Sequence, residues 1–122
     1  MIIHLPFPDM SLATNKSKGK HWSVTSKKRS TARLEAFYLT KQANISIKNK
    51  NAPVGLKITF VQKDKRKRDL QNQLEACKPF LDGIADAIGV DDYYFAPITI
   101  HREFSDIAFT KIEIIEESYA NT

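Results

Sequence analysis

Apolar residues recur at alternating spacings of four and three between residues 70 and 88, and this period predicts an amphipathic helix with one buried stripe. The stripe consists of Leu70, Leu74, Cys77, Leu81, Ile84, Ala85 and Ile88. Asp69 precedes the stripe and can accept hydrogen bonds from amides of the first turn, while Gly89 follows it and tolerates a left-handed backbone. Both ends of the predicted helix are therefore marked.

The other face of this helix carries polar side chains, again at spacings of four and three. They are Gln71, Glu75, Lys78 and Asp82. Pro79 lies deep inside the helix, where it removes a backbone donor and clashes one turn back, so we expect a kink near Lys78. The pattern predicts a row of polar groups one turn apart.

Other segments show the period of two that is typical of strands. Residues 54–62 alternate between apolar and polar side chains and predict a half-buried strand, and residues 1–5 predict a short one. Residues 93–102 and 107–115 predict two more strands, which we expect to form a hairpin around a turn at residues 104–106.

The segment between the first strand and residue 54 has a weaker pattern. Residues 9–20 are polar and predict a mobile basic loop, residues 21–25 predict a short strand, and residues 30–45 predict a helix of moderate amphipathicity. The predicted fold class is α+β (mixed α/β), with a small mixed β-sheet and two helices packed on one of its faces.

Composition limits the domain count and suggests the kind of partner. The chain has 122 residues, of which 42% are hydrophobic and 27% charged, and its net charge is +5. This length supports one modest core, so we expect a single domain over residues 1–122. The cations are concentrated in residues 16–33 and 63–68, which favours an anionic partner, although many basic proteins bind nothing specific.

Cysteine usage and hydropathy bear on the compartment. Cys77 is the single cysteine, so no disulfide forms within the chain, and its place on the apolar stripe predicts a buried filler. No stretch approaches the ~20 apolar residues that span a bilayer, and the N-terminus lacks a basic start. We expect a cytoplasmic protein that makes no membrane contact.

A dense block of cations precedes the predicted helix at residue 70. It consists of Lys63, Lys65, Arg66, Lys67 and Arg68. Such a run is commonly a solvated loop. Here it lies between a strand and a helix N-terminus, whose free amides already favour anions. We therefore expect these side chains to contact nucleic-acid phosphates, with binding that weakens steeply as salt is added.

Three motifs follow one another through the middle of the chain. They are Asp69-Leu70-Gln71-Asn72, Lys78-Pro79-Phe80-Leu81-Asp82-Gly83 and Gly89-Val90-Asp91-Asp92. Near the N-terminus stand Leu5-Pro6-Phe7-Pro8 and Asn15. Together with the block of cations, these motifs resemble the signature of the RusA family of Holliday-junction resolvases. The resemblance implies a RusA-like fold and a structure-selective endodeoxyribonuclease of DNA recombination and repair.

The resemblance also implies Mg²⁺ or Mn²⁺ held by carboxylates. Asp69 and Asp92 would be ligands, with Asp91 as the second choice to Asp92. Gln71 stands where the family has a second carboxylate, and Glu75, one turn further along the helix, is a candidate replacement. Gathered carboxylates repel one another unless a cation lies between them, and all-oxygen ligands suit Mg²⁺.

The remaining implied roles concern charge and DNA. Lys78 would stabilise negative charge in the reaction, so the candidate catalytic residues are Lys78, Asp69, Gln71 and Asp92. Asn15 and Lys16 would join the block of cations in binding branched DNA. A junction has two-fold symmetry and two strands to cut, which predicts a homodimer.

Two questions stay open from the sequence. A helix over residues 70–88 would place Asp69 about 30 Å from Gly89. Either the chain after Gly89 folds Asp92 back, or the second acidic group comes from the partner in a dimer. The absence of a carboxylate at Gln71 leaves two functions, a junction-cleaving nuclease and a non-catalytic protein that binds branched DNA.

Overall fold

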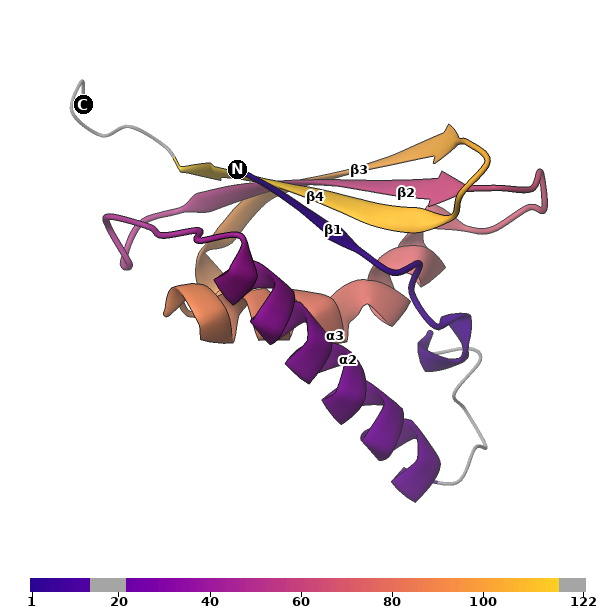
Figure 1. Cartoon of the computed structure of the whole chain (residues 1–122), viewed down its shortest axis with the longest axis horizontal. Coiled ribbons are helices and arrows are strands. Elements are labelled where there is room, and N and C mark those ends of the chain that lie inside the picture. Colours follow the sequence, from indigo (N-terminus) through magenta and orange to yellow (C-terminus); the bar gives the residue numbers. More distant parts are fainter. Residues whose placement is uncertain (14–21, 117–122) are drawn as a thin grey trace.

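A four-stranded sheet with two helices makes up the computed structural model, which describes residues 1–13 and 22–116. The elements are β1 (Ile2–Leu5), the 3₁₀ turn η1 (Met10–Leu12), α2 (Trp22–Gln42), β2 (Val54–Gln62), α3 (Leu70–Ile88), the 3₁₀ turn η2 (Asp92–Tyr94), β3 (Phe95–Phe104) and β4 (Phe109–Glu116). Both helices lie on the same face of the sheet (Figure 1). The predicted α+β class is confirmed.

The sheet is mixed and has the strand order β1-β4-β2-β3. β4 pairs antiparallel with both β1 and β2, whereas β3 pairs parallel with β2 and forms one edge of the sheet. Strand β2 has the bounds expected from its alternation, but the prediction that it is half-buried is wrong, because only Lys57 is exposed. Helix α3 begins and ends where its caps predict.

The core lies between the sheet and α3. Leu56 and Ile58 of β2 are opposite Ile114 and Ile112 of β4, and all four side chains are buried. Cys77 projects from α3 into this core, where burial raises the pKa of its thiol to about 12. The prediction that Cys77 is a buried filler is confirmed.

Helix α2 begins earlier than the sequence indicates. Residues 22–25, part of the segment expected as a strand, form its first turn, and the helix ends at Gln42 rather than near residue 45. Val24, Leu34 and Tyr38 are exposed, so the apolar residues of α2 do not form one stripe and the helical period is faint.

The predicted hairpin of the last two strands is wrong in its pairing. Both strands form, but β2 lies between them, and the connection over residues 105–108 crosses the end of β2. The Ser105 amide donates to the Gln62 carbonyl at 2.9 Å, which anchors this crossing. A period of two identifies a strand but not its neighbour, and the buried β2 segment takes the central place.

Among the described residues, no helix is both long and apolar enough to cross a bilayer.

Candidate functional site

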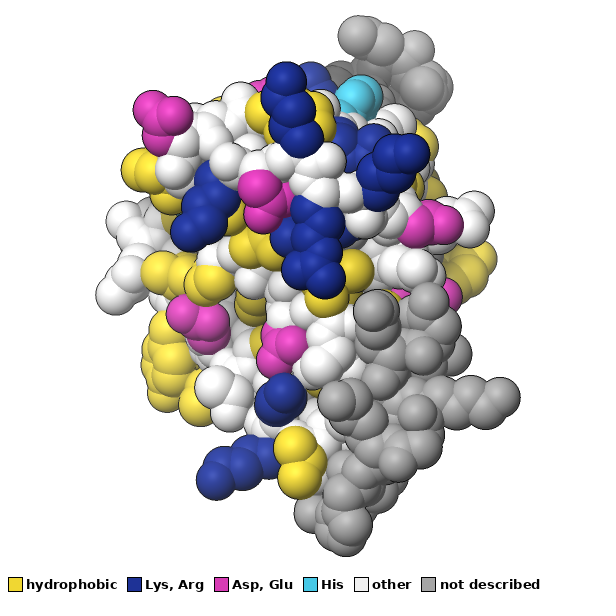
Figure 2. Space-filling model, turned by 90° about the vertical axis from the view of Figure 1, so that its right-hand side faces the viewer, with side chains coloured by type: hydrophobic (Ala, Val, Ile, Leu, Met, Phe, Trp, Pro, Cys, Tyr) yellow, Lys and Arg dark blue, Asp and Glu magenta, His cyan; other side chains and the backbone are white. Residues whose placement is uncertain are grey.

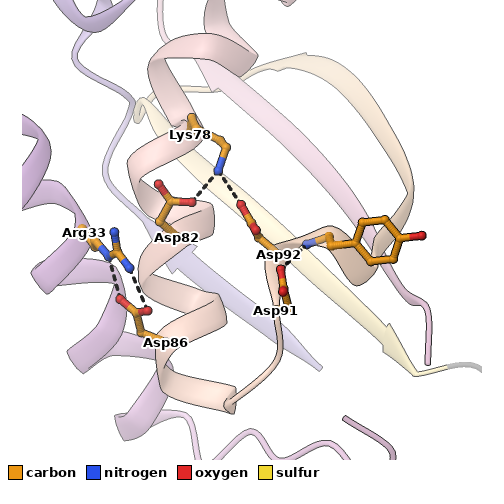
Figure 3. Close-up of polar contacts among 7 residues, drawn as sticks. Arg33, Lys78, Asp82, Asp86, Asp91 and Asp92 are labelled. Carbon is orange, nitrogen blue, oxygen red and sulfur yellow. Dashed lines mark hydrogen bonds and ion pairs between the residues drawn. The ribbon is translucent and has the colours of Figure 1, made fainter. Parts of the chain in front are cut away.

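A groove of about 720 Å³ lies over the polar face of α3. Glu75, Lys78 and Asp82 form its floor. One wall comes from α2, and the other comes from Asp92 with the first half of β3. Figure 3 shows this order, with α2 on one side of α3 and Asp92 on the other. The predicted polar row thus lines one groove from Glu75 to Asp82.

Lys78 joins two carboxylates in this groove. Its Nζ donates to Asp82 Oδ1, one turn along α3, and to Asp92 Oδ2 at 2.7 Å (Figure 3). Burial lowers the pKa of Lys78, but the two carboxylates outweigh that effect, so the pKa is raised overall. The hydrogen bond from Lys78 also lowers the pKa of Asp92. Lys78 and Asp92 are therefore both charged at neutral pH.

The turn after α3 explains how Asp92 reaches Lys78. Gly89 adopts the left-handed conformation, with φ of 70°, and its amide donates to the Ala85 carbonyl. The chain then reverses beside α3, and Asp91 caps η2 by accepting from the Tyr93 amide at 2.9 Å. This reversal brings Asp92 back to the middle of α3 within one protomer.

Asp69 does not meet Asp92. Its carboxylate accepts from the Gln71 amide at 2.8 Å as the N-cap of α3, and it lies in a separate hollow with the cations of residues 65–68. Lys78, which contacts Asp92, lies nine residues later, or about 14 Å of helical rise. The expectation that Asp69 and Asp92 share one metal in the same protomer is wrong, because the chain after Gly89 brings Asp92 back only as far as Lys78.

The other predicted metal ligands do not all lie together in the groove. Gln71 is exposed on the first turn of α3 and does not line the groove, whereas Glu75 does. The Asp91 carboxylate is engaged as the cap of η2. Asp82 belongs to the polar row predicted from the sequence but was not among the predicted ligands, although its spacing of four from Lys78 indicates that the two side chains can meet.

The donors of the groove fit Mg²⁺ in a limited way. Among residues 1–13 and 22–116, no three His, Cys, Asp or Glu side chains gather closely enough to hold a metal. Mg²⁺ is commonly bound through one or two carboxylates, with water and substrate phosphate completing its octahedron. Asp82 and Asp92 could meet that lower requirement through Oδ2 and Oδ1, the carboxylate oxygens that Lys78 does not contact, so they are the pair that could hold the ion.

A further ion pair joins α2 to α3. Arg33 donates to both oxygens of Asp86, at 2.6 and 2.9 Å, which raises the pKa of Arg33 and lowers that of Asp86 (Figure 3). Gly83 lets the helices approach, since a Cβ there would lie 2.1 Å from the Arg33 carbonyl oxygen. No sequence spacing could have predicted this contact, because the partners lie 53 residues apart.

The block of cations forms the loop between β2 and α3, on the face shown in Figure 2. Lys63, Lys65, Arg66 and Lys67 are exposed, and none forms an ion pair with another described residue. Arg68 differs, because it pairs with Asp64 at 2.9 Å and its guanidinium carbon lies over the Phe7 ring, 5.3 Å from the centroid, in a cation–π contact. Arg68 therefore has a structural role in addition to any contact with DNA.

Two buried glutamines hold this loop from inside. Gln62 Nε2 donates to the carbonyls of Asp64, at 3.4 Å, and Arg66, at 3.2 Å, so Gln62 Oε1 is left to accept. It accepts from Gln73 Nε2 at 2.9 Å, and Gln73 Oε1 accepts nothing from the described residues. The direction of this chain of hydrogen bonds, which we call the glutamine relay, is thus set by the loop carbonyls.

Two predicted DNA contacts, Asn15 and Lys16, lie outside the described residues.

The comparisons with known proteins supply no functional name. No family model matches the chain. An uncharacterized protein from Xylella fastidiosa (strain Temecula1 / ATCC 700964) is 36% identical over 95 residues, which is 75% of this chain. The chain spans 60% of the length of that curated relative.

Proposed function

We propose that the protein is a Mg²⁺-dependent, structure-selective endodeoxyribonuclease that resolves Holliday junctions in recombination and repair. The observation that carries the proposal is the convergence of Lys78, Asp82 and Asp92 in one groove. The exposed cations of the loop over residues 63–68, in a second hollow, support it. The resemblance of the surrounding motifs to the RusA family adds the substrate class.

The groove and the loop lie along a common path on β3. Ile98 lines the groove, and Arg102 lines the hollow beside the loop cations. The two residues project from the same face of β3 and lie about 13 Å apart at 3.3 Å per residue. That length matches about four nucleotides of a strand at 3.4 Å each. One strand of DNA can therefore contact both features.

Each group has a proposed role. Asp82 and Asp92 would hold the ion, and Glu75, in the same groove, would supply a further oxygen. A bound Mg²⁺ would polarise the scissile phosphate and lower the pKa of a water molecule. Lys78 neutralises the two carboxylates and would afterwards offset negative charge on the phosphate. Loop cations would bind the flanking phosphates.

A homodimer belongs to the proposal, because a junction presents two equivalent strands. Light scattering of the purified protein at micromolar concentration should give twice the mass of the 122-residue chain. A monomer both with and without junction DNA would remove the paired-cut part of the proposal.

A second candidate function is branched-DNA binding without cleavage. It is favoured by the separation of Asp69 from Asp92 and by Gln71, which lies outside the groove. In this case the exposed cations alone would hold the junction. The protein would then bind four-way junctions in EDTA, without any metal, and it would nick none of them when Mg²⁺ is added.

A nicking assay on a labelled four-way junction in Mg²⁺ or Mn²⁺ separates the two. We expect cleavage by the wild type, and Asp82→Asn and Asp92→Asn should each lower it about 100-fold or more while binding persists. Asp106→Asn, which removes the same charge from an exposed loop, is the matched control. Binding without nicks by the wild type in either metal would reject the nuclease and leave the binding protein.

A further inference from the structure

One face of α2 forms a wall of the groove, and none of the sequence motifs includes its residues. Ser26, Arg29, Ser30 and Arg33 lie at spacings of three, one and three, which places them on one side of the helix. A helix face beside a packed neighbour is usually apolar. This one presents two hydroxyls and two guanidinium groups, the side-chain types that bind phosphate oxygens.

The two arginines of this wall are in different states. Arg33 is held by both oxygens of Asp86. Arg29 is exposed and forms no ion pair with a described residue. Arg29 is therefore the available cation of the wall, with Ser26 and Ser30 one turn away and adjacent to it.

Charge is distributed unevenly across the groove. The α3 side and the far wall carry three carboxylates against one ammonium, Lys78, and this excess of negative charge repels an anion; the carboxylates are those of Glu75, Asp82 and Asp92. The α2 wall carries Arg29 and Arg33. A phosphodiester in the groove would therefore be attracted toward α2, with its reacting side facing the carboxylates and any ion they hold. The loop cations lie in a separate hollow and cannot supply this attraction.

We propose that Arg29, with Ser26 and Ser30, forms a second phosphate-binding site, which clamps the backbone of a DNA strand across the groove from Asp82 and Asp92. This inference rests on the proposed DNA-binding function but not on cleavage. It adds a contact point on α2 to the one on the loop over residues 63–68.

Equilibrium binding to a fluorescent four-way junction in EDTA tests the clamp, because no cleavage occurs without metal. Affinity is measured between 50 and 300 mM NaCl for Arg29→Gln and for Lys41→Gln, an equal charge change on an exposed position near the other end of α2. Losing one phosphate contact lowers the salt slope by about 0.9 and weakens binding about fivefold near 0.15 M salt. Arg29→Gln should show both effects, and Lys41→Gln neither.

A junction series with single methylphosphonate linkages identifies the contacted phosphate. The neutral linkage at the phosphate that Arg29 contacts should weaken binding of the wild type, and it should not weaken the binding of Arg29→Gln any further. Thermal unfolding of Arg29→Gln should match the wild type, which excludes a loss of folding.

The outcomes separate the two levels of the proposal. If the wild type binds no DNA, the proposed function fails and the clamp fails with it. If Arg66→Gln weakens binding while Arg29→Gln behaves like Lys41→Gln, the clamp is refuted and the DNA-binding function stands.

Discussion

Substituting Gln62 and Gln73 tests how the loop over residues 63–68 is held. Both side chains are less than 2% exposed, so water cannot replace their partners without opening the structure. In Gln62→Leu, the loop carbonyls lose their donor, and the Gln73 amide is left buried without a partner. In Gln73→Leu, only Gln62 Oε1 loses a partner, and an oxygen that was already unpaired is removed.

The two substitutions should therefore differ in cost. A hydrogen bond contributes about 1 kcal/mol net, and a buried group left unpaired costs about 1–3 kcal/mol. For Gln62→Leu, one stranded amide plus lost loop contacts give a loss of about 3 kcal/mol in the free energy of unfolding. For Gln73→Leu, the removal of the unpaired oxygen offsets part of the loss, leaving about 1 kcal/mol.

The double variant completes the cycle. Since Gln62→Leu is costly mainly through the stranded Gln73 amide, adding Gln73→Leu should recover about 1–2 kcal/mol. Urea denaturation followed by circular dichroism at pH 7 measures all three values. Equal costs for the single variants, or costs that add in the double variant, would refute the direction assigned to the glutamine relay.

Three further predictions concern the helix cap, the ion pairs and the helix contact. Asp69→Asn should retain stability, because asparagine caps equally well, whereas Asp69→Ala should lose about 1 kcal/mol in urea denaturation. Lys78→Met should raise the pKa of Asp92 in an NMR titration. In the wild type, Lys78 lowers this pKa, which stabilises the fold above about pH 4, and the stabilisation is lost as pH falls through the pKa of Asp92 in the folded protein. Gly83→Ala should destabilise by about 2 kcal/mol or more in urea, although alanine favours helices, because its Cβ would strike α2; an unchanged midpoint would contradict that contact.

Much of the fold could be predicted from the sequence because it depends on interactions between residues close together in the chain. The stripe, the cap at Asp69 and the left-handed Gly89 all act within a few residues, so they predicted the bounds of α3. The alternation of residues 54–62 predicted β2 for the same reason. Where side-chain pattern and local capping agree, the sequence is sufficient.

Pairing and helix contacts were not readable in this way. The position of β2 between β3 and β4 depends on which strand is most completely buried, a property of the whole sheet. Helix α2 is held in place by its contacts with α3 and β1, and the helical period of apolar residues in its own sequence is weak. Tertiary packing overrides local propensity in both cases.

The candidate site was predicted in part. Lys78 and Asp92 were selected and do meet, and Glu75 shares their groove. Asp69 was assigned to the same centre, but its carboxylate serves as a helix cap. The order of the motifs along the chain does not say how far back along α3 the turn after Gly89 brings Asp92. That distance decides which carboxylate of α3 becomes the neighbour of Asp92.

Cleavage of a four-way junction with one strand labelled at its 5′ end shows where the reacting centre lies when Asp82→Asn is compared with Asp69→Asn in Mg²⁺. We expect nicks by the wild type and by Asp69→Asn, whose amide still caps α3, and loss of nicking in Asp82→Asn. Full cleavage by Asp82→Asn together with none by Asp69→Asn would contradict this expectation, because the reacting centre would then lie at the start of α3 and not in the groove.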